Sequence, residues 1–290
     1  VADAEDLVQD AYLRWHRTDG RKVHNMEAFL VTVITRLSSD HLRAAKLKRE
    51  SYAGQWLPEP LPTFDLPAQE YGVETMDTLS MAFMVLLERL NPVERAVYVL
   101  REVFDYNFGE VAAVVEKRED NCRKIFARAR TRVGQARTRF ETDAAKQHQL
   151  LTQFIETCES GDLKALEALF AQDIALCSDG GDYVKTAFNI ISTPSKVARF
   201  ILGIMGKWPA DVYFGFVEIN GGQALAFYLA GHPMAVIALD ADGDGVHALR
   251  MMYNLDKIKA AFDRAGPIIG EINLPPRKCW ATGGTPAVRV

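Results

Sequence analysis

The chain has 290 residues, of which 48% are hydrophobic, and this length suits two or three domains with buried cores. A formal net charge of -4 excludes a uniformly basic nucleic-acid binder, so charge has to be followed segment by segment. The 4 cysteines lie far apart without metal-ligand spacing or a disulfide framework, which favours reduced thiols and a cytoplasmic location. No apolar run reaches the roughly 18 residues of a membrane-spanning helix, and no signal peptide is visible, so no membrane partner is expected.

The sequence opens inside a helical pattern from Ala2 to His16, and we therefore expect native residues before Val1. An apolar stripe should face inward, formed by Leu7, Val8, Ala11, Tyr12 and Trp15. Another face is acidic, with Asp3, Asp6 and Asp10. These acids serve either docking to a partner or only solubility and compensation of the helix dipole.

A loop containing Asp19-Gly20 separates this helix from a second one, which should run from Met26 to about Arg49. Its inward residues are predicted to be Phe29, Leu30, Val33, Ile34, Leu37 and Leu42. Arg36, Asp40 and Arg43 share one polar face, and Lys46, Lys48 and Arg49 extend its basic end. Such a face is suited to tracking a nucleic-acid backbone.

The segment from Ser51 to Glu88 holds no Lys or Arg but several acids. It contains Trp56-Leu57-Pro58-Glu59-Pro60-Leu61-Pro62, followed by Pro67, and prolines at this density favour an extended linker. Two interpretations stay open. Either the Trp and Leu pack on another part of the chain, or the segment is an ordinary spacer.

Helical periodicity resumes near Thr75 and stops at Asn91-Pro92, where Pro92 suits the first turn of the next helix. Residues 108–115 predict a short supporting helix, and a polar turn at 116–118 leads into a basic helix. The basic helix should bury one stripe, formed by Cys122, Ile125, Phe126, Ala129 and Val133. Two short helices with a basic second member are typical of a DNA-binding helix-turn-helix, the alternative being a solvated basic helix without a ligand.

The second half of the chain changes from helices to strands. Residues 150–158 predict a helix that ends at Ser160-Gly161, and Asp162 is placed to cap another. Strands are expected at residues 174–178, 213–219, 224–229, 234–239 and 247–253, with a hairpin turn at Asn220-Gly221. We therefore expect an α+β domain in which helices pack on a curved antiparallel sheet around a cone-shaped cavity.

Several motifs follow one another in a telling order: Asp3-Ala4-Glu5-Asp6-Leu7-Val8-Gln9-Asp10, Ala28-Phe29-Leu30 to Asp40-His41-Leu42-Arg43, and Leu90-Asn91-Pro92-Val93-Glu94-Arg95 before the helix-turn-helix. Through them, the first 140 residues or so resemble an extracytoplasmic-function (ECF) RNA polymerase sigma factor. The second half resembles SnoaL-like members of the NTF2-like superfamily, through its layout, Gly161-Asp162-Leu163 and Ser178-Asp179-Gly180-Gly181. Together they resemble the ECF subgroup with such a domain as a fused regulator.

The resemblance implies an all-α sigma-2 domain (1–52), a linker (53–76), an all-α sigma-4 domain (77–140), an NTF2-like regulatory domain (148–265) and a tail (266–290). It implies an alternative sigma factor, not an enzyme and without a cofactor or metal. Its partners would be the β and β′ subunits of core RNA polymerase and promoter DNA, read at the −10 and −35 elements. The regulatory domain would tune activity in cis by contacting sigma-2, sigma-4 or their linker.

The family's functional positions can be matched to this sequence. Docking on polymerase would use Asp3, Glu5, Asp6, Gln9 and Asp10. The −10 element would be opened and read by Asn25, Arg36, Asp40, Arg43 and Lys46, with Asn25 beside an extruded base. The −35 element would be read by Lys117, Arg118, Asn121, Arg123, Lys124, Arg128 and Arg130. Arg132 is expected to hold phosphate too, and Asp120 or Glu119 to cap the recognition helix where relatives have a hydroxyl residue.

Interdomain regulation would use Trp56, Leu57, Pro58, Glu59, Pro60, Asp179, Gly180, Gly181, Asn254, Asp256 and Lys257. Two motifs match the subgroup incompletely: residues 179–184 fit its glycine-rich motif only in part, and Leu255 stands where the family has proline.

Three alternatives are weighed. A stand-alone helix-turn-helix regulator would bind duplex DNA without polymerase and sense a small molecule, with Trp208, Phe214, Phe216, Tyr228 and Tyr253 as pocket or simply core. An NTF2-like enzyme would draw on Asp211, Asp179, His232 and His247. A calcium loop at 240–251 would need a carboxylate where Met251 stands, so a polar hairpin turn is the better interpretation.

Overall fold

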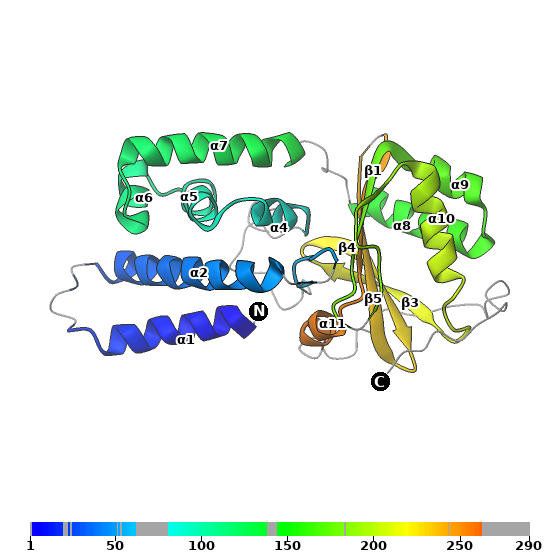
Figure 1. Cartoon of the computed structure of the whole chain (residues 1–290), viewed down its shortest axis with the longest axis horizontal. Coiled ribbons are helices and arrows are strands. Elements are labelled where there is room, and N and C mark those ends of the chain that lie inside the picture. The colour runs from blue at the N-terminus through cyan, green and yellow to red at the C-terminus, as the bar shows by residue number, and fades with distance from the viewer. Residues whose placement is uncertain are drawn as a thin grey trace. The chain divides into compact units, whose positions relative to one another are not determined.

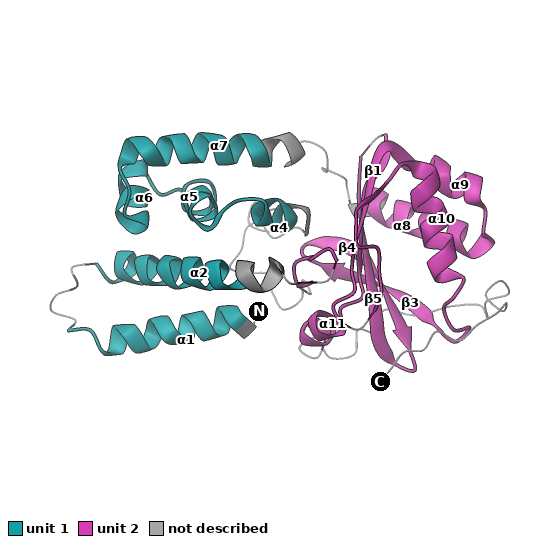
Figure 2. Cartoon of the chain, viewed as in Figure 1, with its two compact units in different colours: residues 1–51, 83–136 teal, residues 52–82, 137–290 magenta. Residues whose placement is uncertain are grey.

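The computed structural model describes residues 2–19, 23, 25–50, 52, 54–61, 81–137, 144–182, 184–242 and 244–262. The chain divides into two compact units (Figure 2). Unit 1 combines residues 1–51 with 83–136, and unit 2 combines 52–82 with 137–290. The start of the linker therefore belongs with the C-terminal half, whereas the expected tail 266–290 and linker residues 62–76 lie outside the described residues.

Unit 1 is helical (Figure 1). Its elements are α1 (Ala2–His16), α2 (Met26–Glu50), α4 (Met81–Glu88), α5 (Pro92–Glu102), α6 (Phe108–Val115) and α7 (Glu119–Arg137). Helix α1 packs on α2, and α2 also packs on α5 and α6. The helical half of the fold prediction is thus confirmed, and the two helical regions contact each other through α2.

Two capping boxes fix where the helices of the helix-turn-helix region begin. The side chain of Asn91 accepts the N–H of Glu94, and Glu94 in turn accepts the N–H of Asn91, at the start of α5. Asn107 and Glu110 repeat this arrangement at the start of α6. Glu116 ends α6 in the left-handed region with φ 53°, which turns the chain toward α7. Each box satisfies backbone donors that the first helical turn leaves unpaired.

The buried stripe of α7 is as predicted. Cys122, Ala129 and Val133 are almost wholly buried and Ile125 is 6% exposed, and they pack on residues from α4, α5 and α6. The stripe predicted for α1 is wrong in part, because Val8 and Tyr12 are 59% and 60% exposed, while Ala11 is buried against α2. Helix α1 packs mainly on α2, so the residues that it buries form only a narrow face.

Unit 2 is an α+β domain. Its helices are α8 (Ala144–Ser160), α9 (Leu163–Ala168), α10 (Pro194–Met205) and α11 (Leu255–Phe262). Its strands are β1 (Phe170–Asp179), β2 (Ile191–Ser192), β3 (Tyr213–Ile219), β4 (Gly222–Leu229), β5 (His232–Asp242) and β6 (Gly245–Met252). Asp162 caps α9 as expected, and β1 begins at Phe170, four residues before the strand expected at 174–178.

The sheet has the order β2-β1-β6-β5-β4-β3. Its pairs are antiparallel except β1 with β6, which run parallel from Ala175↔Ala248 to Asp179↔Met252. The sheet is therefore mixed, which corrects the expected purely antiparallel arrangement. The connection between β1 and β6 runs through four further strands and α10, so nothing in local periodicity signals the direction of that pairing.

The predicted turn at Asn220-Gly221 is confirmed, since both residues have positive φ, 54° and 73°, as a two-residue hairpin of the primed type requires. The helices α8, α9 and α10 lie on one face of the sheet, and α11 covers the other (Figure 1). Trp208, Phe214 and Tyr253 are part of the core on the first face. None of the helices that the structure describes is long and apolar enough to cross a membrane.

Candidate functional site

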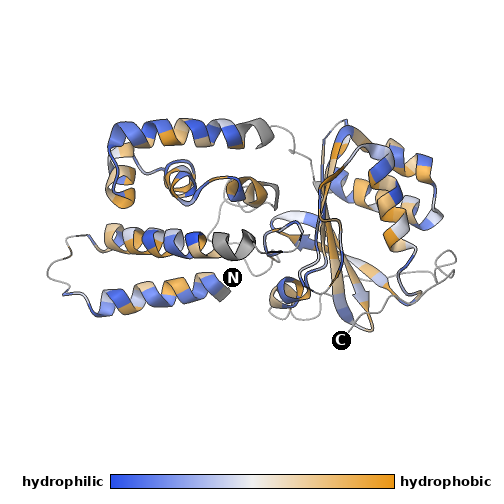
Figure 3. Ribbon diagram, viewed as in Figure 1, coloured by the Kyte–Doolittle hydropathy of each residue, from blue (hydrophilic) through white to orange (hydrophobic). Residues whose placement is uncertain are grey.

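The surface of α7 has the composition of a nucleic-acid contact. All seven residues predicted for −35 recognition are exposed: Lys117, Arg118, Asn121, Arg123, Lys124, Arg128 and Arg130. Figure 3 shows α7 in predominantly hydrophilic colours, in contrast to the hydrophobic α4 and α6. Positive side chains on one helix with an apolar seam behind them can approach phosphates without opening the core.

Arg123 is held in place before any DNA arrives. Its guanidinium pairs with Glu119 one turn earlier at 2.5 Å and lies 4.6 Å above the ring of Phe108 in α6. Arg118 pairs with Asp120 at 3.2 Å, so the two acids expected to cap α7 each neutralise an arginine in the absence of DNA. A phosphate or base would have to compete with these exposed pairs, which are individually weak.

Arg132 has a structural contact that the sequence did not predict. Its Nη1 donates to both carboxylate oxygens of Glu94, at 2.9 and 3.0 Å, and the side chain of Glu94 is 7% exposed. Glu94 thus completes the capping box of α5 and ties α5 to α7. Arg132 thus holds α7 on α5, and because its side chain is 54% exposed, its contact with phosphate stays a prediction.

Three of the residues predicted for the −10 element, Arg36, Asp40 and Arg43, are exposed on α2. Arg43 pairs with Asp40 at 2.6 Å, and Arg36 pairs with Glu116 at the end of α6, also at 2.6 Å. The side-chain amide oxygen of Asn25 accepts the N–H of Ala28 and so caps α2. The side chain of Lys46 lies outside the described residues.

Helix α1 presents the predicted docking acids to solvent. Asp3, Glu5, Asp6, Gln9 and Asp10 are all exposed. Asp3 also pairs with His41 of α2 at 3.2 Å. The exposed apolar residues Val8, Tyr12 and Leu13 lie on the same helix, so α1 offers acidic and apolar groups together. Such a mixture is suited to a protein partner.

Unit 2 brings the predicted regulatory motifs to one point, the carboxylate of Asp179, which is fully buried. Its Oδ2 accepts the N–H of Leu57 at 2.8 Å and pairs with Nζ of Lys257 at 2.7 Å. Its Oδ1 accepts the N–H of Gly181 at 3.1 Å and the hydroxyl of Tyr52. We name Tyr52, Leu57, Asp179, Asn254 and Lys257 the Asp179 cluster.

Lys257 completes this cluster by binding the linker twice. Its Nζ donates to the carbonyl of Leu57 at 2.6 Å and lies 4.0 Å from the centre of the Trp56 ring. The Asn254 amide donates to the hydroxyl of Tyr52 at 2.9 Å, and its oxygen caps α11 by accepting the N–H of Asp256. Asp256 itself is exposed, so it lies at the edge of the cluster rather than inside it.

The rest of the linker start follows the surface of unit 2. Pro58 and Pro60 are buried, and Leu61 exchanges two backbone-directed hydrogen bonds with Asn220 at the β3–β4 turn, of 2.7 and 3.1 Å. We call residues 52–61 the linker strap. Of the two interpretations of the linker, packing on the chain is therefore correct for the strap.

The glycines beside Asp179 are required by close approach. A Cβ on Gly180 would lie 2.0 Å from the carbonyl of Val184, and one on Gly181, whose φ is +57°, would lie 2.9 Å from the Asn254 side chain.

Burial first, and then the hydrogen bond to Asp179, raise the pKa of Tyr52 well above its usual value. Tyr52 therefore stays a neutral hydroxyl donor to a carboxylate.

Three of the four residues considered for catalysis, Asp179, His232 and His247, do not converge. Asp179 is committed to the strap, and His232 and His247 lie near opposite ends of the β5–β6 hairpin. His247 lies between Asp173 and Asp242, at 2.5 and 2.9 Å. The 240–251 segment forms the predicted hairpin, with Asp242 opposite Gly245 and Met251 fully buried. Within the described ranges, no group of three or more His, Cys, Asp or Glu residues is arranged to hold a metal.

Sequence reasoning missed several participants. Tyr52 and Asn220 hold the strap, Glu94 anchors Arg132, and Glu116 meets Arg36. The spacing of Asn91 and Glu94 would have indicated a capping box. The other contacts join residues 38 or more positions apart along the chain, for which a single sequence contains no local signal.

Comparison with known proteins agrees with this arrangement. Residues 1–48 match the model of Sigma-70 region 2, and residues 80–133 match that of Sigma-70, region 4. The ECF RNA polymerase sigma factor SigJ of Mycobacterium tuberculosis is 35% identical over 237 residues, which span 80% of this chain and 75% of SigJ. The probable ECF RNA polymerase sigma factor SigI of the same species is 32% identical over 174 residues, spanning 57% of this chain and 58% of SigI.

The likeness extends to the fold of both halves. The crystal structure of Mycobacterium tuberculosis SigJ superposes with a TM-score of 0.67 at 29% sequence identity, covering 90% of this chain and 91% of that one. The two sigma-70 regions coincide with the helical unit, and the fused α+β domain accompanies them. On the identity and the shared length with SigJ, the chain belongs to the ECF RNA polymerase sigma factors.

Proposed function

We propose that this sigma factor directs core RNA polymerase to promoters through α2 and α7, and that unit 2 regulates it by holding the linker strap. Helix α7 would read the −35 element, with Arg123 and Lys124 toward base edges and Arg128 and Arg130 on phosphates. The exposed side of α2 would engage the −10 element. The acidic and apolar surface of α1 would dock on polymerase.

The observation that supports the regulatory part is the Asp179 cluster. Removing one partner of a buried charge pair lowers the stability of a protein by at least about 3 kcal/mol, because the other charge stays buried without a counter-ion. Here both charges also bind linker backbone. Strap binding and the integrity of the cluster are therefore coupled, and the strap is not a passive spacer.

Holding the strap limits how far the two DNA-binding regions can separate. Residues 51–80 connect α2 to α4, and the strap takes residues 52–61 out of that span. Its release would free ten residues, whose fully extended length is roughly 33–36 Å. The state of unit 2 thus sets the reach between the −10 and −35 readers.

Contacts inside unit 1 support a resting state. Arg36, proposed to bind the −10 element, is engaged by Glu116 of the other sigma-70 region. Promoter binding would therefore exchange this exposed pair for DNA contacts, at a cost of no more than about 1 kcal/mol.

The test is promoter-dependent transcription with purified core polymerase, comparing wild type with Arg123→Ala, Lys257→Met and Lys259→Met. We expect Arg123→Ala to lose preference for the −35 sequence and Lys257→Met to change output on every promoter without altering that preference. Lys259 is exposed on the same helix as Lys257 and serves as the control. Unchanged output from Lys257→Met would contradict regulation by the strap, and tight duplex binding without any initiation would favour a stand-alone regulator.

A further inference from the structure

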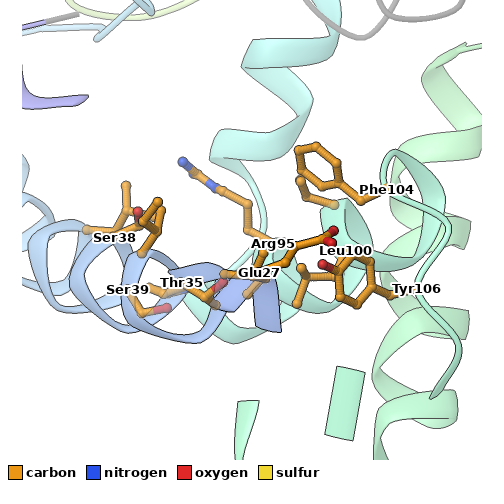
Figure 4. Close-up of a pocket in the computed structure, with 14 residues that line it drawn as sticks. Glu27, Thr35, Ser38, Ser39, Arg95, Leu100, Phe104 and Tyr106 are labelled. Atoms are coloured by element: carbon orange, nitrogen blue, oxygen red, sulfur yellow. The ribbon is translucent and has the colours of Figure 1, made fainter. Parts of the chain in front are cut away.

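Unit 1 contains a cavity of about 510 Å³ that none of the roles above uses (Figure 4). One wall is α2, and the other is α5 with the loop that follows it. The two walls belong to different sigma-70 regions. Cavities that bind small organic molecules have volumes of roughly 300–1,000 Å³, so this one has ligand size.

The greater part of the lining is apolar. Val31 and Ile34 of α2 face Val99 and Leu100 of α5, and Phe104 closes the rim. Ile34 is 36% exposed and Phe104 is 61% exposed, although both are large hydrophobic residues. An apolar group lying between the two walls would remove this surface from water.

The guanidinium of Arg95 lines the cavity, and some of its N–H groups have no hydrogen-bond acceptor among the described residues. The side chain of Arg95 is 19% exposed, and its Nη1 donates to Glu88 at 3.2 Å. Its Nε is buried without a hydrogen-bond partner, and Nη2 has none among the residues that the structure describes. In Figure 4 the Arg95 side chain extends between Ser38 and Phe104, and Ser38 and Ser39 add hydroxyl groups to the same lining.

A second polar group restricts what the cavity accepts. Glu27 lines it near Tyr106, and burial first, then the negative charge of Glu27, raise the pKa of the Tyr106 hydroxyl. A ligand with a second negative charge would meet Glu27, whereas a ligand with one anionic head and an uncharged body would meet Arg95 and apolar walls.

We propose that this cavity binds a small amphipathic monocarboxylate. Its head would pair with the Arg95 guanidinium and the Ser38 hydroxyl, and its aliphatic or aromatic tail would lie between Ile34 and Val99. Arginine is suited to the head because its planar donors match a carboxylate. This cavity in unit 1 is a different site from the one considered in the sequence analysis, where aromatic residues of unit 2 were weighed as a pocket or as core.

Such a ligand would bind the two sigma-70 regions together. Because both supply walls, a change in their relative placement would break the site, so the ligand favours the arrangement seen here. Linkage then requires that polymerase weaken ligand binding by the same factor as the ligand weakens polymerase binding, if polymerase separates the regions. This consequence rests on the proposed function, whereas binding itself does not.

The test uses the full chain and isothermal titration with decanoate, with decanol as the uncharged probe. We expect saturable binding of decanoate at one site and binding of decanol weaker by roughly tenfold or more, since the charged head is missing. Arg95→Met should weaken decanoate by a similar factor, and Ile34→Trp should abolish binding by filling the cavity. Arg89→Met is the control, because Arg89 is exposed and does not line the cavity.

Arg95→Met also removes the ion pair with Glu88, so a loss of ligand binding in this variant could come from altered folding. Ile34→Trp leaves that ion pair intact and therefore tests the cavity independently. Wild-type affinity in Ile34→Trp, equal binding of decanol and decanoate, or no saturable binding would each overturn the site. Saturable binding that does not reduce association with polymerase would leave the site standing and overturn its coupling to the proposed function.

Discussion

At the scale of single residues, the function proposed for unit 2 depends on one buried charge pair. Asp179 is fully buried and Lys257 is 10% exposed, yet each also bonds to linker backbone. The sequence placed both in regulatory motifs by resemblance to a family. It did not show that Asp179 would be the acceptor and Lys257 its partner, because 78 positions separate them.

Lys257→Met should destabilise unit 2 by about 3–5 kcal/mol, since the Asp179 carboxylate would stay buried without its cation. Lys259→Met, at an exposed position of the same helix, should change stability by less than about 0.5 kcal/mol. Thermal unfolding of the full chain measures both. Limited proteolysis should also cut the strap faster in Lys257→Met. Equal melting curves and equal cleavage would contradict the account of the cluster.

His247 gives a pH-dependent prediction. Burial lowers the pKa of His247, but its hydrogen bonds to Asp242 and Asp173 outweigh this and raise the pKa above its usual value. The stabilisation is therefore complete below the unfolded pKa of about 6.5 and is lost as pH rises through the folded pKa. The difference in melting temperature between wild type and His247→Gln should shrink from about pH 6 toward pH 9. A difference that grows over that range would contradict the assignment.

At the scale of elements, periodicity predicted most helices and strands because each buries one regular face. The range of α6 and the buried stripe of α7 agree with the sequence, as do β3 and its hairpin turn. Helix α10 was missed although its sequence holds a local signal, with Pro194 in the first turn and Val197, Ile201 and Met205 on one buried face. The parallel β1–β6 pairing was not predicted because it follows from tertiary packing rather than local pattern.

The capping boxes offer a matched comparison between elements. Glu94→Ala removes one hydrogen bond of a capping box and also the ion pair with Arg132. Glu110→Ala removes only the equivalent capping-box hydrogen bond, because the Glu110 side chain is exposed. We expect a loss of about 1 kcal/mol for Glu110→Ala and roughly 2–3 kcal/mol for Glu94→Ala. Urea unfolding of the two variants checks the difference. Identical losses would mean that the Glu94–Arg132 pair does not stabilise unit 1.

The ion pair between Arg36 of α2 and Glu116 at the end of α6 allows the role of Arg36 in this pair to be distinguished from its proposed role in DNA binding. Arg36→Ala and Glu116→Ala remove the same exposed pair and should each change stability by less than about 1 kcal/mol. Arg36→Ala should additionally reduce opening of the −10 element, because it removes a proposed DNA contact, whereas Glu116→Ala should not. Permanganate footprinting of promoter complexes distinguishes them. Equal opening by both variants would remove Arg36 from the −10 surface.

At the scale of the whole molecule, charge segregation predicted the sequence of basic helix, acidic linker and basic helix. It did not predict how these parts divide into units. The two sigma-70 regions share unit 1 although the linker separates them in the sequence, and the strap belongs to unit 2. That division results from buried contacts between distant residues, which composition and periodicity do not encode.

The central claim is that one chain contains both a sigma factor and a regulator that acts through the linker. Promoter-dependent transcription with core polymerase tests it most directly, by comparing the full chain with a chain cut after residue 143, which lacks α8 and everything after it. We predict that both initiate and that the cut changes output, with Lys257→Met in the full chain shifting output in the same direction. Equal output from all three proteins would contradict regulation in cis. If none of the three initiates transcription, the sigma-factor account itself is contradicted.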